Sequence, residues 1–145
     1  MALDELRAAR VGPGWRLVLP GRTPTKGNHR VKARGRDVLL PSKGYMRWMK
    51  ETAWSAVTLW ARLRNAGVTL PAATPIRISI AVYLPNPQRG DEDNYKKAVG
   101  DWLQTNNFVV NDRLIHWHET RIGLDRQEPR LELVVQPYTM QPGEI

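Results

Sequence analysis

The alternation of apolar and polar residues is most regular between residues 76 and 84. A period of two places successive side chains on opposite faces of an extended chain, so this segment is predicted to be a strand with one face on the core. Pro85 and Pro87 end it. Shorter patterns of the same kind predict three more strands, at residues 15–19, 114–122 and 130–137.

Two other segments repeat their apolar residues at helical spacing. The first is predicted to run from an N-cap at Ser42 to about Ala66, with Gly67 ending it. The second is predicted from about Asn94 to Gln104. The expected apolar stripe of the first helix is Met46, Met49, Ala53, Val57, Trp60 and Leu63, and that of the second is Tyr95, Ala98, Val99, Trp102 and Leu103.

These elements follow one another as strand, basic loop, helix, strand, helix, strand and strand. Such an order favours an α+β fold, in which two main helices pack on a small mixed β-sheet. A length of 145 residues predicts a single domain. Residues 1–14 are ambiguous between a short helix and a flexible extension, and residues 138–145 are expected to form a tail.

The composition indicates the class of partner and excludes several kinds of chemistry. The formal net charge is +8 with an isoelectric point near 10.3, so a polyanion is the expected partner. The absence of cysteine excludes disulfides, thiolate metal sites and cysteine nucleophiles. No stretch approaches the roughly 20 apolar residues of a membrane span, and the first residues do not resemble a signal peptide.

Positive charge is concentrated between residues 21 and 37, where no acid occurs before Asp37. Glycine and proline punctuate the segment, which is predicted to be a loop or a loose hairpin. The alternative to DNA contact is a solvated loop, but an uninterrupted basic run favours phosphate binding. The side chains predicted to contact DNA are Lys26, Arg30, Lys32, Arg34 and Arg36.

Two aspartates, Asp91 and Asp93, immediately precede or begin the second helix. Residues two positions apart in an extended chain point their side chains to the same side, as these two aspartates are expected to do. Lys97 lies four residues past Asp93, so the two share one helical face. The turn before the next strand is able to return Asp112 to this place. Oxygen-only ligands suit Mg²⁺ and Mn²⁺, so these three carboxylates are predicted to bind one or two metal ions.

A metal held there would polarise a phosphodiester, generate hydroxide and stabilise the leaving oxygen. Lys97 would add positive charge or orient the attacking water. Asn94 and Asp101 are predicted to support the site, Asp101 by holding Lys97 from four residues further along the helix. The simpler interpretation is that acids at a helix start only complement its dipole.

Three further possibilities carry less weight. A calcium-binding EF-hand loop is excluded because Tyr95 and Trp102 occupy positions that need oxygen side chains, and its central glycine is missing. His116 and His118 have the spacing of a transition-metal pair, although packing or surface histidines are far commoner. Trp48 lies off the first helical stripe, where it would stack on a base or seal a dimer, but burial is favoured.

The stretch from Arg89 to Leu103, followed by Val109 to Asp112, resembles the RusA family of Holliday-junction resolvases. Its D-E-D-N-Y-K-K, D-W-L and N-D segments match the family pattern D-x-D-N-x-x-K, D-x-L and D-D without a gap. One position departs from it, because Asn111 stands where the family has the first aspartate of its D-D pair, which lowers the charge of the site.

The resemblance implies that Asp91, Asp93 and Asp112 are catalytic, metal-binding aspartates and that Lys97 is an essential lysine. It also implies a homodimer that cuts four-way DNA junctions symmetrically with Mg²⁺, for which Mn²⁺ is expected to substitute. The predicted function is therefore a crossover junction endodeoxyribonuclease of DNA recombination and repair, acting on branched DNA rather than on a membrane or a small-molecule substrate. The expected location is bacterial cytoplasm, with a host or a phage gene. The alternatives are a looser nuclease for flaps or single-strand regions, and a DNA-binding protein that never cuts.

Overall fold

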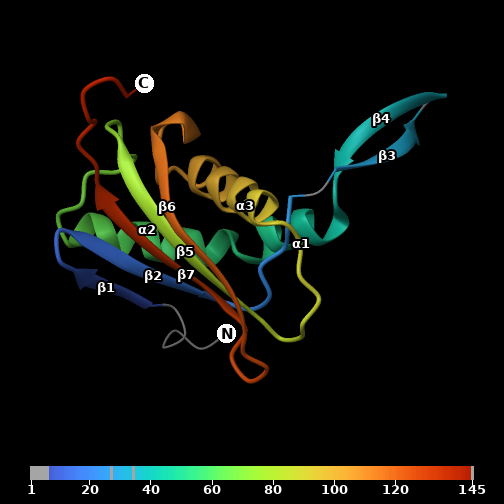
Figure 1. Ribbon diagram of the computed structural model, residues 1–145, viewed down its shortest axis with the longest axis horizontal. Coiled ribbons are helices and arrows are strands. Elements are labelled where there is room, and N and C mark those ends of the chain that lie inside the picture. The colour runs from blue at the N-terminus through green and yellow to red at the C-terminus, as the bar shows by residue number, and fades with distance from the viewer. Residues whose placement is uncertain (1–6, 27, 34, 145) are drawn as a thin grey trace.

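The computed structural model describes residues 7–26, 28–33 and 35–144, with only the backbone described for Arg7 and for the strands β3 and β4. Its elements, shown in Figure 1, are β1 (Arg7–Val11), β2 (Gly14–Pro20), β3 (Asn28–Ala33), β4 (Arg36–Pro41), α1 (Lys43–Glu51), α2 (Ala53–Asn65), β5 (Ile76–Leu84), α3 (Glu92–Thr105), a short 3₁₀ helix (Asp112–Leu114), β6 (Ile115–Leu124) and β7 (Arg130–Pro137). No helix in these ranges is long and apolar enough to cross a membrane. The predicted α+β class is confirmed.

Five strands form the main sheet, in the order β1-β2-β7-β5-β6. Only β5 and β6 are parallel, and the other neighbours are antiparallel, so the sheet is mixed. The strand predicted at residues 76–84 has those bounds, and its side chains alternate between buried and half-buried along its whole length. The buried side chains share one core cluster with α2 and α3, which shows that the helices cover one face of the sheet.

The predicted first helix begins at Ser42, whose hydroxyl accepts a hydrogen bond from the Tyr45 amide at 3.2 Å. It does not continue to Ala66 as one helix, because Thr52 ends α1 and begins α2. The Thr52 hydroxyl donates to the Trp48 carbonyl at 2.7 Å and accepts from the Trp102 indole at 2.9 Å. A threonine bonded back to the preceding turn is a recognised cause of a helix bend.

The buried face of the first helical segment lies about one position from the predicted stripe. The predicted stripe is wrong at Met46, Ala53 and Val57, all of which are exposed. The core side chains are Tyr45, Trp48, Ser55, Ala56, Leu59 and, as predicted, Leu63. These positions keep one helical spacing through Thr52, so the period was right and the choice of face was wrong.

The N-terminal region forms more regular structure than the sequence predicted. Residues 7–11 are the edge strand β1, paired with β2 across the turn at Gly12 and Pro13, rather than a flexible extension or a helix. Gly12 has φ of 55°, a left-handed conformation that glycine adopts without strain. The basic segment forms the antiparallel hairpin β3–β4, which extends away from the main sheet in Figure 1.

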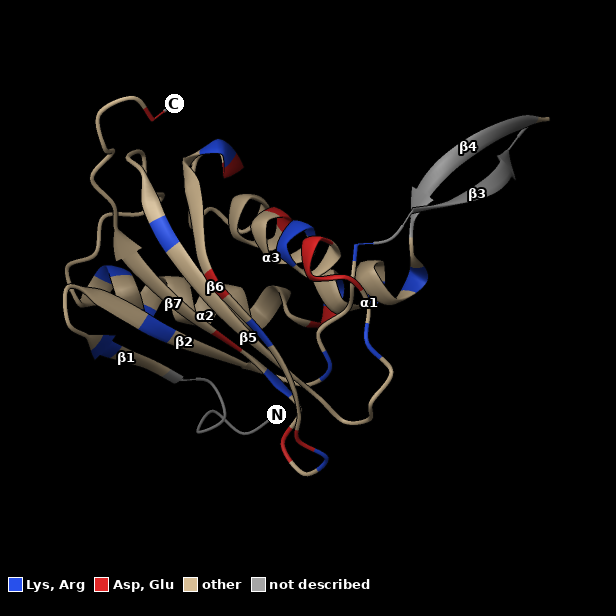
Figure 2. Cartoon of the chain, in the orientation of Figure 1, with Lys and Arg blue, Asp and Glu red and all other residues tan. Residues whose placement is uncertain are grey.

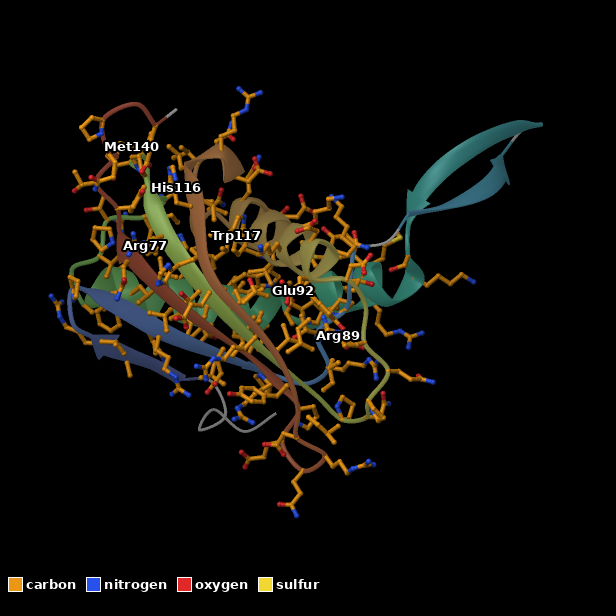
Figure 3. All side chains as sticks on the ribbon, in the orientation of Figure 1. Arg77, Arg89, Glu92, His116, Trp117 and Met140 are labelled. Atoms are coloured by element: carbon orange, nitrogen blue, oxygen red, sulfur yellow. The ribbon has the colours of Figure 1, made fainter. Side chains whose placement is uncertain are left out.

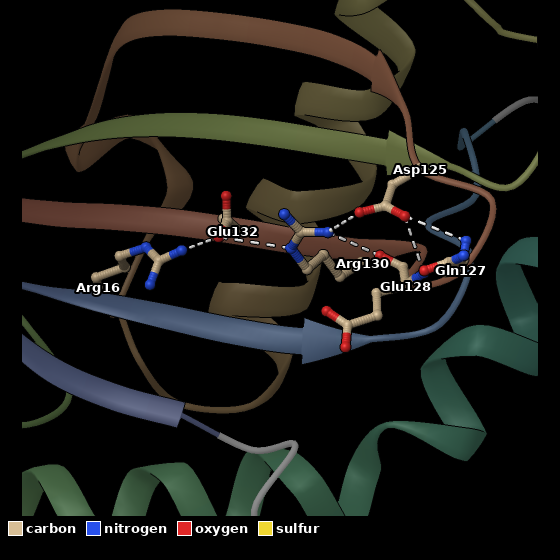
Figure 4. Close-up of polar contacts among 6 residues, drawn as sticks. All are labelled: Arg16, Asp125, Gln127, Glu128, Arg130 and Glu132. Atoms are coloured by element: carbon tan, nitrogen blue, oxygen red, sulfur yellow. Dashed lines mark hydrogen bonds and ion pairs between the residues drawn. The ribbon is translucent and has the colours of Figure 1, made fainter.

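The face of the sheet opposite the helices carries an ion-pair network between β2 and β7 (Figure 4). Glu132 accepts from Arg16 and lies 3.6 Å from Arg130, which donates to Asp125 at 2.8 Å. The backbone amide of Glu128 and the Arg130 guanidinium hold the pKa of Asp125 below its usual range. The network therefore joins the loop after β6 to the middle of the sheet.

Candidate active site

The start of α3 places two of the predicted site aspartates on its exposed first turn. Asp91 is the N-cap, and its carbonyl accepts from the amides of Asn94 and Tyr95 at 3.1 and 3.2 Å. The Asp91 carboxylate makes no capping hydrogen bond within the described ranges. Capping therefore does not account for this acid, although both carboxylates still complement the helix dipole.

The loop before α3 is fixed by a glycine that another side chain approaches closely. The Gly90 amide donates to the hydroxyl of buried Tyr95 at 3.1 Å. A Cβ atom at Gly90 would lie only 2.4 Å from Cγ2 of Thr25, so a larger residue would push the two segments apart. This contact holds the segment that leads into the β3–β4 hairpin against the start of α3.

Lys26 continues this contact and connects three elements. Its amide donates to the Asn94 carbonyl at 3.1 Å, and its ammonium group lies 3.3 Å from Asp101 and 5.5 Å from the ring centre of Tyr45. The Tyr45 hydroxyl also donates to Asp101. Asp101 thus has partners other than the predicted Lys97, and Lys26 is engaged with α3 rather than projecting freely toward DNA.

The third aspartate returns to α3 through the 3₁₀ helix. The Asp112 amide donates to the Gln104 side-chain oxygen at 3.0 Å, which ties Asp112 to the last turn of α3. Asn111 caps the 3₁₀ helix by accepting from the Arg113 amide at 2.9 Å. A carboxylate accepts the same bond, so Asn111 keeps the capping geometry of the family aspartate while removing its charge.

Asp93, Lys97 and Asp112 line one shallow hollow of about 350 Å³, together with Lys96, Gly100, Ile115 and Trp117. The sequence predicted that Asp112 returns beside Asp91 and Asp93, and Asp112 does share the hollow with Asp93, whereas Asp91 is not among the lining residues. Acidic and basic positions lie next to one another along α3 (Figure 2). The local charge is thus nearly balanced in an otherwise basic protein.

The donor set of the hollow fits a hard divalent cation. No group of three or more His, Cys, Asp or Glu side chains is close enough to share a metal ion in the part of the chain that the structure describes. Mg²⁺, however, is commonly held by one or two carboxylates, with water and phosphate oxygens completing the shell. Asp93 and Asp112 supply two carboxylates on one hollow, and Asp91, whose carboxylate makes no capping bond, lies on the adjoining turn outside the hollow.

Four wall residues of the hollow were not predicted from the sequence, namely Lys96, Gly100, Ile115 and Trp117. Lys96 stands beside Lys97 in the chain, and Trp117 is only half buried. Gly100 lies inside α3, and a Cβ atom there would be 3.5 Å from Trp117. A glycine within a helical pattern is a usable signal of close packing, and it marks where Trp117 meets α3.

The remaining predicted residues have different outcomes. The side chains of Arg30, Lys32 and Arg36 and the whole of Arg34 lie outside the described residues, so their contact with DNA stays a prediction. The predicted burial of a first-helix tryptophan is confirmed, because Trp48 is 6% exposed and its ring centre lies 6.3 Å from that of Trp102.

A small α+β domain with strong positive charge and aspartates and lysines around one hollow is typical of a protein that processes nucleic acids. The chain matches the family described as endodeoxyribonuclease RusA over residues 20–136, which include the hairpin, α3 and the 3₁₀ helix. It therefore belongs to this family of nucleases, which act on branched DNA. A comparison with curated proteins gave no significant match.

Proposed function

We propose that the protein is a Mg²⁺-dependent nuclease that resolves four-way DNA junctions by paired, symmetric cuts. The observation that carries the proposal is the hollow shared by Asp93, Lys97 and Asp112 inside the segment that matches the family. When bound there, Mg²⁺ would supply a polarising charge and an activated water. We further propose that Mn²⁺ substitutes for it, because the donors are oxygen atoms.

The side chains of the hollow have separate tasks in this proposal. Asp93 and Asp112 would hold the cation, with Asp91 as a further oxygen donor. Lys97 would bind a non-bridging oxygen of the scissile phosphate, where negative charge grows as water adds and the phosphorane forms. Gln104 would act through Asp112, because its side-chain oxygen holds the Asp112 amide.

We also propose that the active form is a homodimer, because two nicks of like polarity require two equivalent sites. Exposed apolar side chains on α1 and α2 support a contact surface there. Trp54 is 74% exposed, Met46 56% and Val57 57%. Trp48, which the sequence also suggested for this role, is buried and is not available. Sedimentation of the wild type and of Trp54→Ser at micromolar concentration tests the interface, and a wild-type monomer that still makes paired nicks would refute it.

The decisive experiment compares a synthetic four-way junction with a linear duplex of the same sequence, in Mg²⁺ and in EDTA. We expect metal-dependent, symmetric cuts in the junction alone. Asp93→Asn should abolish cutting while leaving junction binding intact or tighter, since it removes a charge that repels phosphate. Glu51→Gln, an exposed acid at the end of α1, is the matched control. Wild-type turnover by Asp93→Asn would refute the catalytic assignment. Single cuts in flaps would instead support a nuclease of looser substrate choice. Binding without any cut would support a DNA-binding protein that is not an enzyme.

A further inference from the structure

A second hollow, of about 700 Å³, lies across β6 from the one that holds the aspartates. Its polar lining comes from Arg77, His116, His118, Tyr138 and Glu144. Arg77 and His116 are register partners on β5 and β6, so their side chains leave the same face of the sheet. Figure 3 labels both residues near Trp117, which separates the two hollows.

The groups of this hollow converge on one side chain, Tyr138. The Arg77 guanidinium carbon lies 4.9 Å from the ring centre of Tyr138, and the Tyr138 ring lies 4.4 Å from that of His116. The Tyr138 hydroxyl donates to both carboxylate oxygens of Glu144, at 2.7 and 2.8 Å. This bond to Glu144 raises the pKa of Tyr138, and the nearby Arg77 opposes the rise. Tyr138 therefore has an arginine against its ring and a carboxylate at its hydroxyl.

An acidic side chain of the chain itself thus occupies a place suited to an anion. Arginine, tyrosine and backbone groups are the usual partners of DNA phosphates, and a carboxylate presents two oxygen acceptors much as a phosphate does. The segment after β7 supplies this carboxylate from an exposed position, so its displacement exposes no core. The hollow is open enough to admit a nucleotide.

The position of the second hollow relates it to the first. Ile115 and Trp117 line both. The two hollows therefore adjoin at β6. A DNA strand seated with one phosphate at Asp93 and Asp112 would pass close to the second hollow.

We propose that the hollow of Arg77, His116 and Tyr138 binds a second backbone phosphate of the cleaved DNA strand, and that Glu144 occupies this site in the free protein. This inference rests on the proposed function, because it needs DNA in the neighbouring hollow. Arg77 and Tyr138 are binding residues here, outside the chemistry of the cut. Glu144 competes with DNA for this site. DNA therefore binds less tightly than it would to the same surface without the Glu144 carboxylate.

Junction affinity measured in EDTA across a range of salt concentrations tests the site without cleavage. Arg77→Gln should weaken binding about tenfold, the lower range for a charged hydrogen bond, and reduce the log–log salt slope by about 0.9. Glu144→Gln should tighten binding about twofold to fivefold, because the exposed carboxylate that holds the Tyr138 hydroxyl loses the charge that competes with a phosphate. In the Arg77→Gln background, the Glu144→Gln change should have no effect.

Matched controls lie in the loop at the opposite end of β7, where Arg126→Gln and Glu128→Gln make the same charge changes on exposed residues. Arg77→Lys should restore part of the affinity and the salt slope, and thermal melting of each variant checks that it folds. The inference would be overturned if Glu144→Gln tightened junction binding no more than Glu128→Gln does. It would also be overturned if Glu144→Gln still tightened binding in the Arg77→Gln background. A third outcome is that the wild type cuts junctions while Arg77→Gln binds them like Arg126→Gln and Glu144→Gln binds them like Glu128→Gln. That result would refute this inference and leave the proposed function standing. If the wild type neither binds nor cuts junctions, the proposed function fails first.

Discussion

Thr52→Val tests how firmly α3 is attached to the bend between α1 and α2. Thr52 is 4% exposed and Trp102 is 0% exposed, and the indole N–H of Trp102 donates to the Thr52 hydroxyl at 2.9 Å. Valine has the shape of threonine and a similar helix propensity, so the change leaves no cavity. It removes the hydroxyl, which donates to the Trp48 carbonyl and accepts from the indole, so the buried indole N–H is left without its acceptor.

The expected loss follows from that single unsatisfied donor. An unpaired buried polar group costs about 1–3 kcal/mol, whereas the Trp48 carbonyl keeps the Thr52 amide as a partner at 2.9 Å. For a domain of about 150 residues each kcal/mol lowers the melting temperature by about 2–4 °C. We therefore expect Thr52→Val to lower it by about 3–10 °C.

Two controls isolate the indole contact in thermal or urea unfolding. Thr58 makes the same type of bond back to the preceding turn, to the Trp54 carbonyl at 3.1 Å, but on a partly exposed position. Thr58→Val should stay within about 0.5 kcal/mol of the wild type. Thr52→Val should also cost less in a Trp102→Phe background, which has no indole donor. Equal costs in both backgrounds would refute the assigned contact.

Three other predictions concern the site, the hairpin and the open sheet face. Gly100→Ala should raise stability by about 0.5–1 kcal/mol, because its Cβ would meet Trp117 and Ile115 at ordinary distances of 3.5 and 3.7 Å, and a lower melting temperature would contradict this. Replacing Arg30, Lys32 and Arg34 together by glutamine should weaken junction binding and reduce the salt slope by about 0.9 per lost phosphate contact, and an unchanged slope would show that the hairpin does not touch DNA. Because the folded pKa of Asp125 is lowered, its contribution to stability is complete above the ordinary carboxyl range of roughly pH 4 and is lost as pH falls through the lower, folded pKa. The difference in urea midpoint between the wild type and Asp125→Asn should accordingly vanish in acid, and a difference that persists there would rule out ionisation as its cause.

The sequence predicted those elements whose apolar period is unbroken. The alternation along β5 and the helical face of α3 are both confirmed, because each element packs one regular face on the core. The bend at Thr52 was not predictable in this way, because Thr58 makes the same local bond without a break in α2, and the Trp102 indole that also holds the Thr52 hydroxyl is fifty positions away in the chain. Tertiary contacts of this kind override a local period.

The candidate site shows the same division between local and distant information. Spacing alone predicted that Asp93 and Lys97 share a helical face, and the turn suggested that Asp112 would return to it. The partners of Asp101 could not be predicted, because Lys26 and Tyr45 belong to segments whose position depends on the Gly90–Thr25 contact. The role of Trp117 was missed because half-burial in a wall and burial in a core give the same sequence pattern.

In our proposal, the arrangement around α3 separates DNA binding from DNA cutting. The hollow itself carries nearly balanced charge, from two lysines and two aspartates, so without a cation it gives DNA little net attraction. The positive charge that accounts for a net +8 must therefore act from other surfaces. Binding in EDTA reports those surfaces, which include Arg77 of the second hollow in our proposal, whereas cutting in Mg²⁺ reports the aspartates. Variants of the two groups should for this reason fail in different assays.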